Sequence, residues 1–234
     1  MAITVAAGIS ATLVFGLTVL VVARLRPHSP WVDRIVRAWS RAWLAPAGVR
    51  VTVEGLQHID ADRSYVVVSN HLSTFDIMAL FVALPLRLRF LAKRELYRIP
   101  VFGPVLRSLG MVEVDRSRPD IEMINGQATE VLSSGQSIVA FPEGKRSRDG
   151  MLGAFKVGAF AIAVANGALV CPVAIEGSRE CWEPGERRIS PGRVRVVAGE
   201  VIDAAAFGRD EVGRLRDETR RVVETTYQRL LSEA

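Results

Sequence analysis

Short β-rich runs alternate with helical patterns along most of this chain, and this alternation limits the fold more than any other feature. The expected strands are residues 49–53, 65–69, 88–92, 111–114, 137–141, 169–175 and 194–197. The expected helices are residues 74–83, 101–109, 120–133, 155–166 and 210–232. Because parallel strands need a crossover that a helix can supply, the pattern favours an α/β fold with a mostly parallel sheet flanked by helices. The 234-residue chain has room for one such domain, over residues 48–234.

The N-terminal stretch has a different composition. Residues 3–23 carry no charge, and Arg24 and Arg26 follow directly. This length matches a helix that crosses the apolar core of a bilayer. A secretory signal carries its positive charge before the apolar stretch, so the order found here argues against one. By the positive-inside rule we expect the two arginines in the cytoplasm. Interspersed Gly, Ser and Thr residues dilute the apolar character, which leaves a tilted or half-inserted helix as an alternative.

A second helix is expected directly afterwards. Four apolar residues recur at every fourth position and three arginines lie on the opposite side: Trp31, Ile35, Trp39 and Trp43 against Arg34, Arg37 and Arg41. Indole rings favour the headgroup region and guanidinium groups pair with lipid phosphate, so the pattern is typical of an interfacial helix. The alternative is an ordinary amphipathic helix packed on the domain. We therefore expect residues 1–47 to anchor the chain to the inner (cytoplasmic) membrane, with the domain on the cytoplasmic side.

Composition narrows the partners. The formal net charge is +5 with 49% hydrophobic residues, which indicates an anionic membrane surface or phosphorylated substrates. Aromatic content is 7%, without basic residues interleaved with aromatics, so a nucleic-acid-binding surface is not expected. Cys171 and Cys181 make no Cys-x-x-Cys pair, and His28, His58 and His71 are scattered. We expect no metal site, and a reducing compartment.

One histidine stands where α/β proteins place their active sites. His71 follows the apolar run 65–68, and Asp76 lies five residues later at the start of an expected helix. A histidine can act as a general base near neutral pH, and a neighbouring carboxylate can fix its tautomer. A helix-capping pair is the plain alternative, and the spacing alone does not separate the two interpretations.

Two later strand ends carry cations. Arg116 closes the run 111–116, and Glu143, Gly144 and Arg146 follow the strand expected at 137–141. Arginine grips phosphate oxygens with two parallel N–H groups, and glycine lets a backbone approach an anion closely. Glu143 could orient the arginines or contact a substrate hydroxyl. Charge runs at turns are usually solvated, which is our expectation for Arg148.

Taken together, these clusters resemble the glycerolipid acyltransferase family, especially the bacterial 1-acylglycerol-3-phosphate acyltransferases. The likeness covers roughly residues 50–200. Four ordered motifs carry it, with a fifth similar stretch at residues 92–103: Asn70-His71-Leu72-Ser73-Thr74-Phe75-Asp76, Val112-Glu113-Val114-Asp115-Arg116, Phe141-Pro142-Glu143-Gly144-Lys145-Arg146-Ser147 and Cys171-Pro172-Val173.

The resemblance implies direct acyl transfer without an acyl-enzyme, metal or cofactor. His71 would take the proton from the sn-2 hydroxyl of 1-acylglycerol 3-phosphate (lysophosphatidate), and Asp76 would orient His71. Arg116, Glu143, Gly144 and Arg146 would hold the glycerol phosphate. Backbone N–H groups near Gly144 would stabilise the oxyanion. The acyl donor would be acyl-CoA or acyl-carrier protein.

Three alternatives are weighed against this activity. A related acyltransferase would act on glycerol 3-phosphate, a lyso-ornithine lipid or another lyso-lipid. A non-enzymatic peripheral membrane-binding protein would use only the Trp/Arg helix and the net charge. A hydrolase is disfavoured because the sequence has no Gly-x-Ser-x-Gly nucleophile motif.

Overall fold

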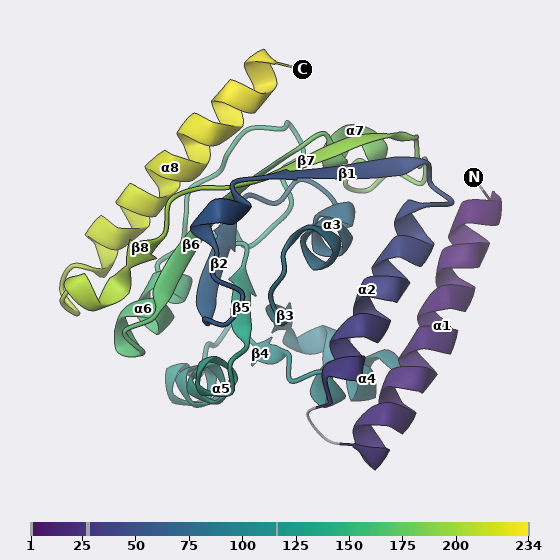
Figure 1. The fold of residues 1–234 in the computed structure, drawn as a ribbon, viewed down its shortest axis with the longest axis horizontal. Coiled ribbons are helices and arrows are strands. Elements are labelled where there is room, and N and C mark those ends of the chain that lie inside the picture. Colours follow the sequence, from purple (N-terminus) through teal and green to yellow (C-terminus); the bar gives the residue numbers. More distant parts are fainter. Residues whose placement is uncertain (1, 27–28, 116, 234) are drawn as a thin grey trace.

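The computed structural model describes residues 2–26, 29–115 and 117–233, and of residues 2–7 it describes the helix alone. The strands are β1 (Val49–Glu54), β2 (Tyr65–Ser69), β3 (Leu88–Lys93), β4 (Val112–Val114), β5 (Ser137–Ala140), β6 (Leu169–Glu176), β7 (Gly192–Ala198) and β8 (Ile202–Asp203). They form one sheet in the order β1-β7-β6-β2-β5-β3-β4, with β8 paired to β6 (Figure 1). Only the pairs β6–β7 and β6–β8 are antiparallel, so the expected mostly parallel α/β sheet is confirmed.

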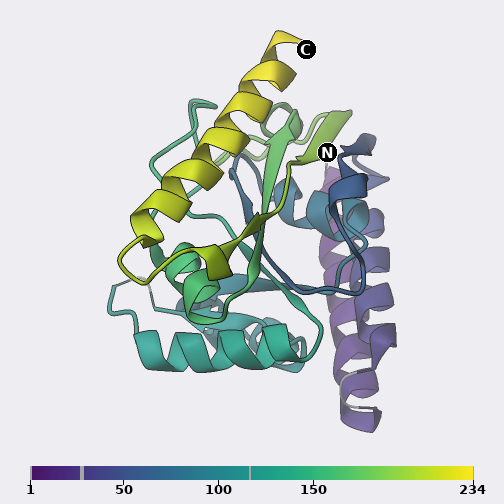
Figure 2. The same cartoon turned by 60° about the vertical axis from the view of Figure 1, so that its left-hand side comes forward.

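Helices cover both faces of the sheet. They are α1 (Ala2–Leu25), α2 (Pro30–Leu44), α3 (Phe75–Ala83), α4 (Phe102–Ser108), α5 (Ile121–Ser133), α6 (Gly158–Ala165), α7 (Ser178–Cys181) and α8 (Val212–Ser232). One hydrophobic cluster joins the sheet to α1, α2, α3 and α4, and a second joins it to α5, α6 and α8. In Figure 2 the pair α1–α2 stands on the side of the molecule opposite α8.

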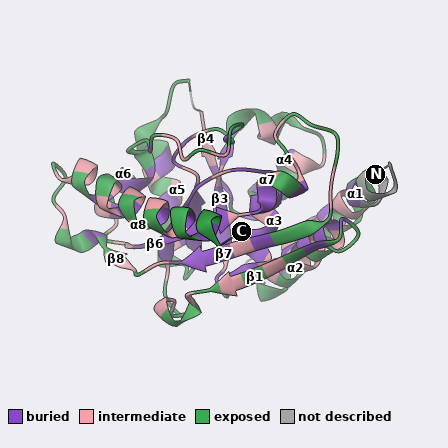
Figure 3. Cartoon of the chain, turned by 90° about the horizontal axis from the view of Figure 1, so that it is seen from above, coloured by how far each residue is buried: buried purple, intermediate pink, exposed green. Residues whose placement is uncertain are grey.

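The central strand β2 explains why the sheet is covered on both faces. Tyr65 and Val67 belong to the first hydrophobic cluster, whereas Val66 and Val68 belong to the second. All four side chains are at most 2% exposed. Side chains of a strand alternate between faces, so a continuous apolar run needs a layer of helices on each side. Figure 3 shows the resulting buried strands beneath helices that are exposed on their outer faces.

Parallel pairing brings distant segments to one edge of the sheet. Val68 of β2 lies opposite Ala140 of β5, and Ser69 lies opposite Val173 of β6. The segments that leave these three strands therefore start from the same edge, which is where α/β proteins bind ligands.

Some elements differ from expectation. Helix α6 begins at Gly158, so residues 155–157 belong to the preceding loop. Helix α7 and strand β8 were not expected, because elements of four and two residues are too short to produce a periodic pattern. Helix α8 lies in the outer layer, and its inner face buries residues such as Leu215 and Val223.

The two N-terminal helices are joined by a polar contact inside an apolar interface. The indole N–H groups of Trp39 and Trp43 both donate to Thr12 Oγ1, at 3.0 and 3.1 Å. The Trp43 ring lies so close to Gly8 that a Cβ there would come within 2.4 Å of it. Glycine at this position therefore lets α1 and α2 approach closely.

Helix α2 is also fastened to the domain. The Arg37 guanidinium donates to the carbonyl groups of Leu84 and Leu86, and Asp33 pairs with Arg89 at 2.7 Å. The interfacial interpretation has the arginines of this helix pair with lipid phosphate, but the Arg37 guanidinium binds carbonyl groups at the end of α3 instead. The alternative of an amphipathic helix packed on the domain is thus confirmed for α2.

Other parts of α1 and α2 remain open to the surroundings. Trp31 is 53% exposed, and the Arg34 guanidinium stacks over its ring at 4.6 Å. Among the described residues, α1 alone has a window, Gly8–Leu25, that is long and apolar enough to cross a membrane, and 11% of that window is buried. Membrane insertion of residues 3–23 stays a prediction.

Candidate active site

The candidate site lies where the segments after β2, β5 and β6 meet. His71 belongs to the loop between β2 and α3, which the side chain of Asn70 holds against β6. The Asn70 side-chain amide donates to the Ile175 carbonyl and accepts from the Ile175 N–H, each at 2.8 Å. These two bonds replace a missing strand pairing and fix the backbone directly before His71.

His71 and Asp76 are in contact, as their spacing predicts. His71 Nδ1 lies 2.7 Å from Asp76 Oδ2. The same oxygen accepts from the backbone N–H groups of Leu72 and Ser73, at 2.6 and 2.8 Å. These donors come from the turn that opens α3, so Asp76 binds both the start of the helix and His71. The plain alternative, a capping pair, therefore describes part of what Asp76 does.

Ser178 completes the surroundings of Asp76. Its hydroxyl, at the start of α7, donates to Asp76 Oδ1. Both side chains are fully buried. With four donors directed at its two oxygens, the carboxylate is satisfied in its charged form although no solvent reaches it.

This network assigns the histidine tautomer. A carboxylate only accepts, so Nδ1 of His71 carries the proton and Nε2 keeps its lone pair. The imidazole stacks on Phe141 with ring centroids 3.9 Å apart, and its side chain is 15% exposed. The hydrogen bond to Asp76 and the stacking on Phe141 together fix the ring plane of His71. Its Nε2 is then left as a proton acceptor.

Glu143 supports the loops around the base. Its Oε1 accepts from the His71 N–H at 2.9 Å and its Oε2 accepts from the Gly153 N–H at 2.8 Å. Burial raises the pKa of this carboxyl group, and the two N–H donors oppose the rise. No ion pair involving Glu143 occurs in the described part of the chain, and Arg146 is oriented by Thr74 instead. Contact between Glu143 and substrate stays a prediction.

The remaining predicted site residues lie on the turn after β5 or outside the described part. Arg146 is exposed and its Nη1 donates to Thr74 Oγ1 at 2.7 Å. Gly144 has φ +74°, and its N–H donates to the Phe141 carbonyl. That N–H closes the turn, and stabilisation of an oxyanion by backbone N–H groups near Gly144 stays a prediction. Arg116 lies outside the described residues.

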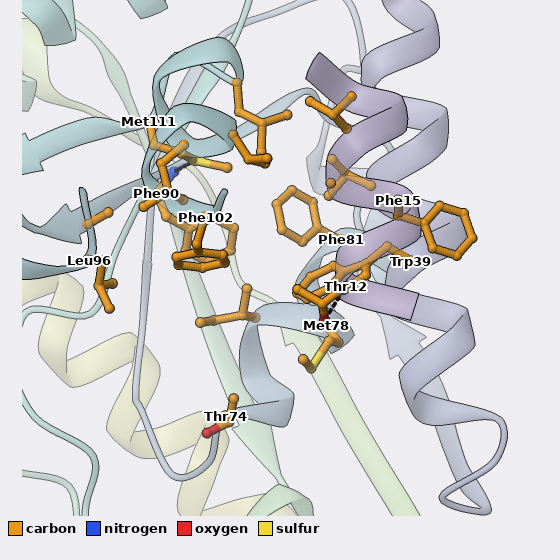
Figure 4. Close-up of a pocket in the computed structure, with 18 of the residues that line it drawn as sticks. Thr12, Phe15, Trp39, Thr74, Met78, Phe81, Phe90, Leu96, Phe102 and Met111 are labelled. Carbon is orange, nitrogen blue, oxygen red and sulfur yellow. Dashed lines mark hydrogen bonds between the residues drawn. The ribbon is translucent and has the colours of Figure 1, made fainter. Parts of the chain in front are cut away.

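A large apolar cavity adjoins the histidine. Its volume is about 580 Å³, and its lining comes from α1, α2, α3, β3 and α4 together with loop residues that include Met111, Phe141 and Trp182. His71, Thr74 and Lys93 supply polar groups of this lining. Figure 4 shows Thr74 apart from most of the apolar side chains, with Met78 and Phe81 on one side and Phe90 and Phe102 on the other. The volume falls within the range of small-molecule sites.

Sequence reasoning missed Ser178 and this cavity. Ser178 lies 102 residues after Asp76, and a serine before a short helix carries no signal of its own. The cavity depends on side chains that lie far apart in the sequence, from Ile9 to Trp182. No group of three or more His, Cys, Asp or Glu side chains that could hold a metal occurs within residues 2–26, 29–115 and 117–233.

Comparison with known proteins identifies the family of this chain. The family described as Acyltransferase matches residues 50–176. A 1-acyl-sn-glycerol-3-phosphate acyltransferase of Pseudomonas aeruginosa is 31% identical, over 88% of this chain and 81% of its own length. The chloroplastic LPAT1 of Arabidopsis thaliana and the alpha enzyme of Mus musculus, both carrying that same name, are each 32% identical. The matches span 57% and 65% of the lengths of those two proteins.

The fold agrees as well. The crystal structure of the 1-acyl-sn-glycerophosphate (LPA) acyltransferase PlsC from Thermotoga maritima superimposes with a TM-score of 0.76 at 27% identity. The superposition covers 94% of this chain and 95% of that one. Sequence and fold thus agree over nearly the whole length, and the chain belongs to the acyltransferase family.

Proposed function

We propose that this protein transfers a fatty acyl group from an acyl thioester to the sn-2 hydroxyl of 1-acylglycerol 3-phosphate, producing phosphatidate. One observation carries the proposal. The unprotonated Nε2 of His71, fixed by Asp76, adjoins an apolar cavity of about 580 Å³. A base that serves a lipid substrate needs this combination of a positioned acceptor and apolar space.

The chemistry follows from the tautomer. His71 Nε2 takes the proton of the acceptor hydroxyl, and the hydroxyl oxygen attacks the carbonyl carbon of the thioester. The C–S bond of the tetrahedral intermediate then breaks, and the imidazolium gives its proton to the leaving thiolate. Asp76 stabilises that imidazolium through Nδ1 and stays ionised, because four donors hold its carboxylate.

The substrates are inferred from the surroundings. The apolar cavity suits a fatty acyl chain, and Arg146 beside Thr74 suits a phosphate. The names of the Pseudomonas and Thermotoga proteins support the same acceptor. With α1 long and apolar enough to enter a bilayer, we place the protein at the cytoplasmic face of the inner membrane, where acyl-CoA or acyl-carrier protein is available.

The test is an assay of the purified full chain in detergent micelles. Acyl-CoA and acyl-carrier protein are supplied separately, with lysophosphatidate, glycerol 3-phosphate or lyso-ornithine lipid as acceptor, and products are identified by mass. We expect turnover with lysophosphatidate. His71→Ala should lower kcat by about 10²–10⁴-fold, because it removes the base.

Other outcomes separate the alternatives. Turnover only with lyso-ornithine lipid or another phosphate-free acceptor would contradict the proposed substrate. The absence of turnover with any acceptor, combined with vesicle binding, would favour the peripheral membrane-binding protein. If His71→Ala kept most of the activity, the assignment of the base would be wrong.

A further inference from the structure

The loop before α6 is built onto the turn that follows β5. The Gly153 N–H donates to Glu143 Oε2 at 2.8 Å, and the Lys156 N–H donates to the Pro142 carbonyl at 3.0 Å. Phe155 between them is buried. These contacts fix the backbone of Lys156 against the turn that carries Arg146.

The side chain of Lys156 lies directly over Gly144. A Cβ built on Gly144 would come within 2.9 Å of the lysine Nζ and 3.3 Å of its Cε. Gly144 also has φ +74°, which side-chain-bearing residues rarely adopt. Glycine at position 144 therefore permits the backbone conformation of the turn and leaves room for the ammonium group of Lys156.

The turn also lies next to the proposed base. The Ser147 N–H donates to the His71 carbonyl at 2.7 Å, and Glu143 on the same turn accepts from the His71 N–H. The turn is thus bonded twice to the backbone of His71. Arg146 lies on this turn, and the side chain of Lys156 lies over it.

Neither cation has a counter-ion in the described part of the chain. Arg146 donates to the hydroxyl of Thr74, and Lys156 forms no ion pair. Glu143, the carboxylate on the same turn, directs both oxygens to backbone N–H groups. One turn and the loop bonded to it therefore carry two positive charges that no carboxylate pairs with, and such a surface attracts an anion. A phosphate monoester carries the two negative charges that would balance them.

We propose that Lys156 is a ligand of the acceptor's phosphate, acting together with Arg146. The inference deepens the proposed function and rests on it. The sequence places Lys156 in a helix expected at 155–166, whereas in the structure it belongs to the loop that precedes α6. Its ammonium group is thereby available to a ligand beside Gly144.

The experiment compares Lys156→Met and Lys156→Arg with the wild-type full chain in detergent micelles. Lys156→Met should raise the KM for lysophosphatidate by about tenfold or more and change kcat by less than about threefold, because a charged contact to the substrate is lost. Lys156→Arg should restore most of the affinity. Lys145→Met is the matched control, since Lys145 is an exposed lysine on the same turn.

A binding measurement separates the two proposals. Without an acyl donor, ³¹P NMR line broadening reports the affinity of glycerol 3-phosphate, which we expect Lys156→Met to weaken by about tenfold. If this weakening occurs but lysophosphatidate is not acylated, the inference stands and the proposed function fails. If lysophosphatidate is acylated and Lys156→Met changes neither KM nor binding, or acts no more strongly than Lys145→Met, the role of Lys156 is overturned.

Discussion

The pair His71–Asp76 and the neighbouring cavity are built on opposite principles. Asp76 receives four hydrogen bonds from donors on the β2–α3 loop and α7, and both of its oxygens are occupied. The cavity, which adjoins His71, is lined mainly by apolar side chains from helices and strands in the first half of the chain. Directional bonds fix the orientation of His71, whereas the cavity depends mainly on the volume that its apolar walls enclose.

Under the proposed function, the two regions have separate tasks: the hydrogen bonds around Asp76 set the reaction rate, and the cavity sets which acyl chain is accepted. A buried carboxylate needs every donor, because an unmet polar group in a dry site costs free energy. An apolar wall tolerates exchange of one side chain for another of similar volume. We therefore expect single changes near Asp76 to act on rate, and single changes in the cavity to act on which chain is accepted.

Of the three changes that test this comparison, Ser178→Ala is expected to lower turnover most. Ser178→Ala removes a donor to a charged, buried oxygen and should lower kcat by about tenfold or more with little change in KM. A double-mutant cycle with Asp76→Asn supplies the control, because the serine acts through that carboxylate. If Ser178→Ala lowered kcat equally in the Asp76→Asn background, its effect would be structural.

A change in the cavity should alter chain selectivity instead. Val19 of α1 is 2% exposed and lines the cavity, so Val19→Phe places a larger side chain there and reduces the space available for an acyl chain. We expect the preferred acyl donor to become shorter, with a several-fold loss for the longest chains. The measurement is kcat/KM across donors of increasing length.

Val21→Phe is the matched control for that change. Val21 lies on the same helix, is 57% exposed and is not part of the cavity lining. It should leave the chain profile unchanged. An equal shift in both variants would mean that the profile does not depend on this cavity.

The smallest effect on turnover is expected from a change at Thr12, a side chain of the cavity wall that forms hydrogen bonds. Thr12→Val removes the acceptor shared by the indole groups of Trp39 and Trp43 and should cost about 2 kcal/mol of stability. Denaturant unfolding in one detergent measures this, with Thr18→Val as control because exposed Thr18 bonds only to its own helix. Equal stability of the two variants would show that Thr12 does not hold α1 to α2.

Prediction from the sequence worked where the interactions are local. The run 65–68 predicts a strand covered on both faces, and the five-residue spacing predicts the contact of His71 with Asp76, because one turn of chain joins them. It failed for Arg37, whose partners are carbonyl groups at the far end of α3. The periodicity gives the faces of a helix, but not the neighbour that each face meets.

The sequence by itself determined the alternation of strands and helices, the uncharged first helix and the order of the motifs, since each depends on neighbours within a few residues. Only the tertiary structure decided that Ser178 reaches Asp76, that Glu143 serves the backbone of two loops, and that Lys156 lies over Gly144. It also decided the cavity, which is the space left when helices from distant parts of the chain pack together. Such contacts depend on how whole elements are arranged, and short-range preferences do not specify that arrangement.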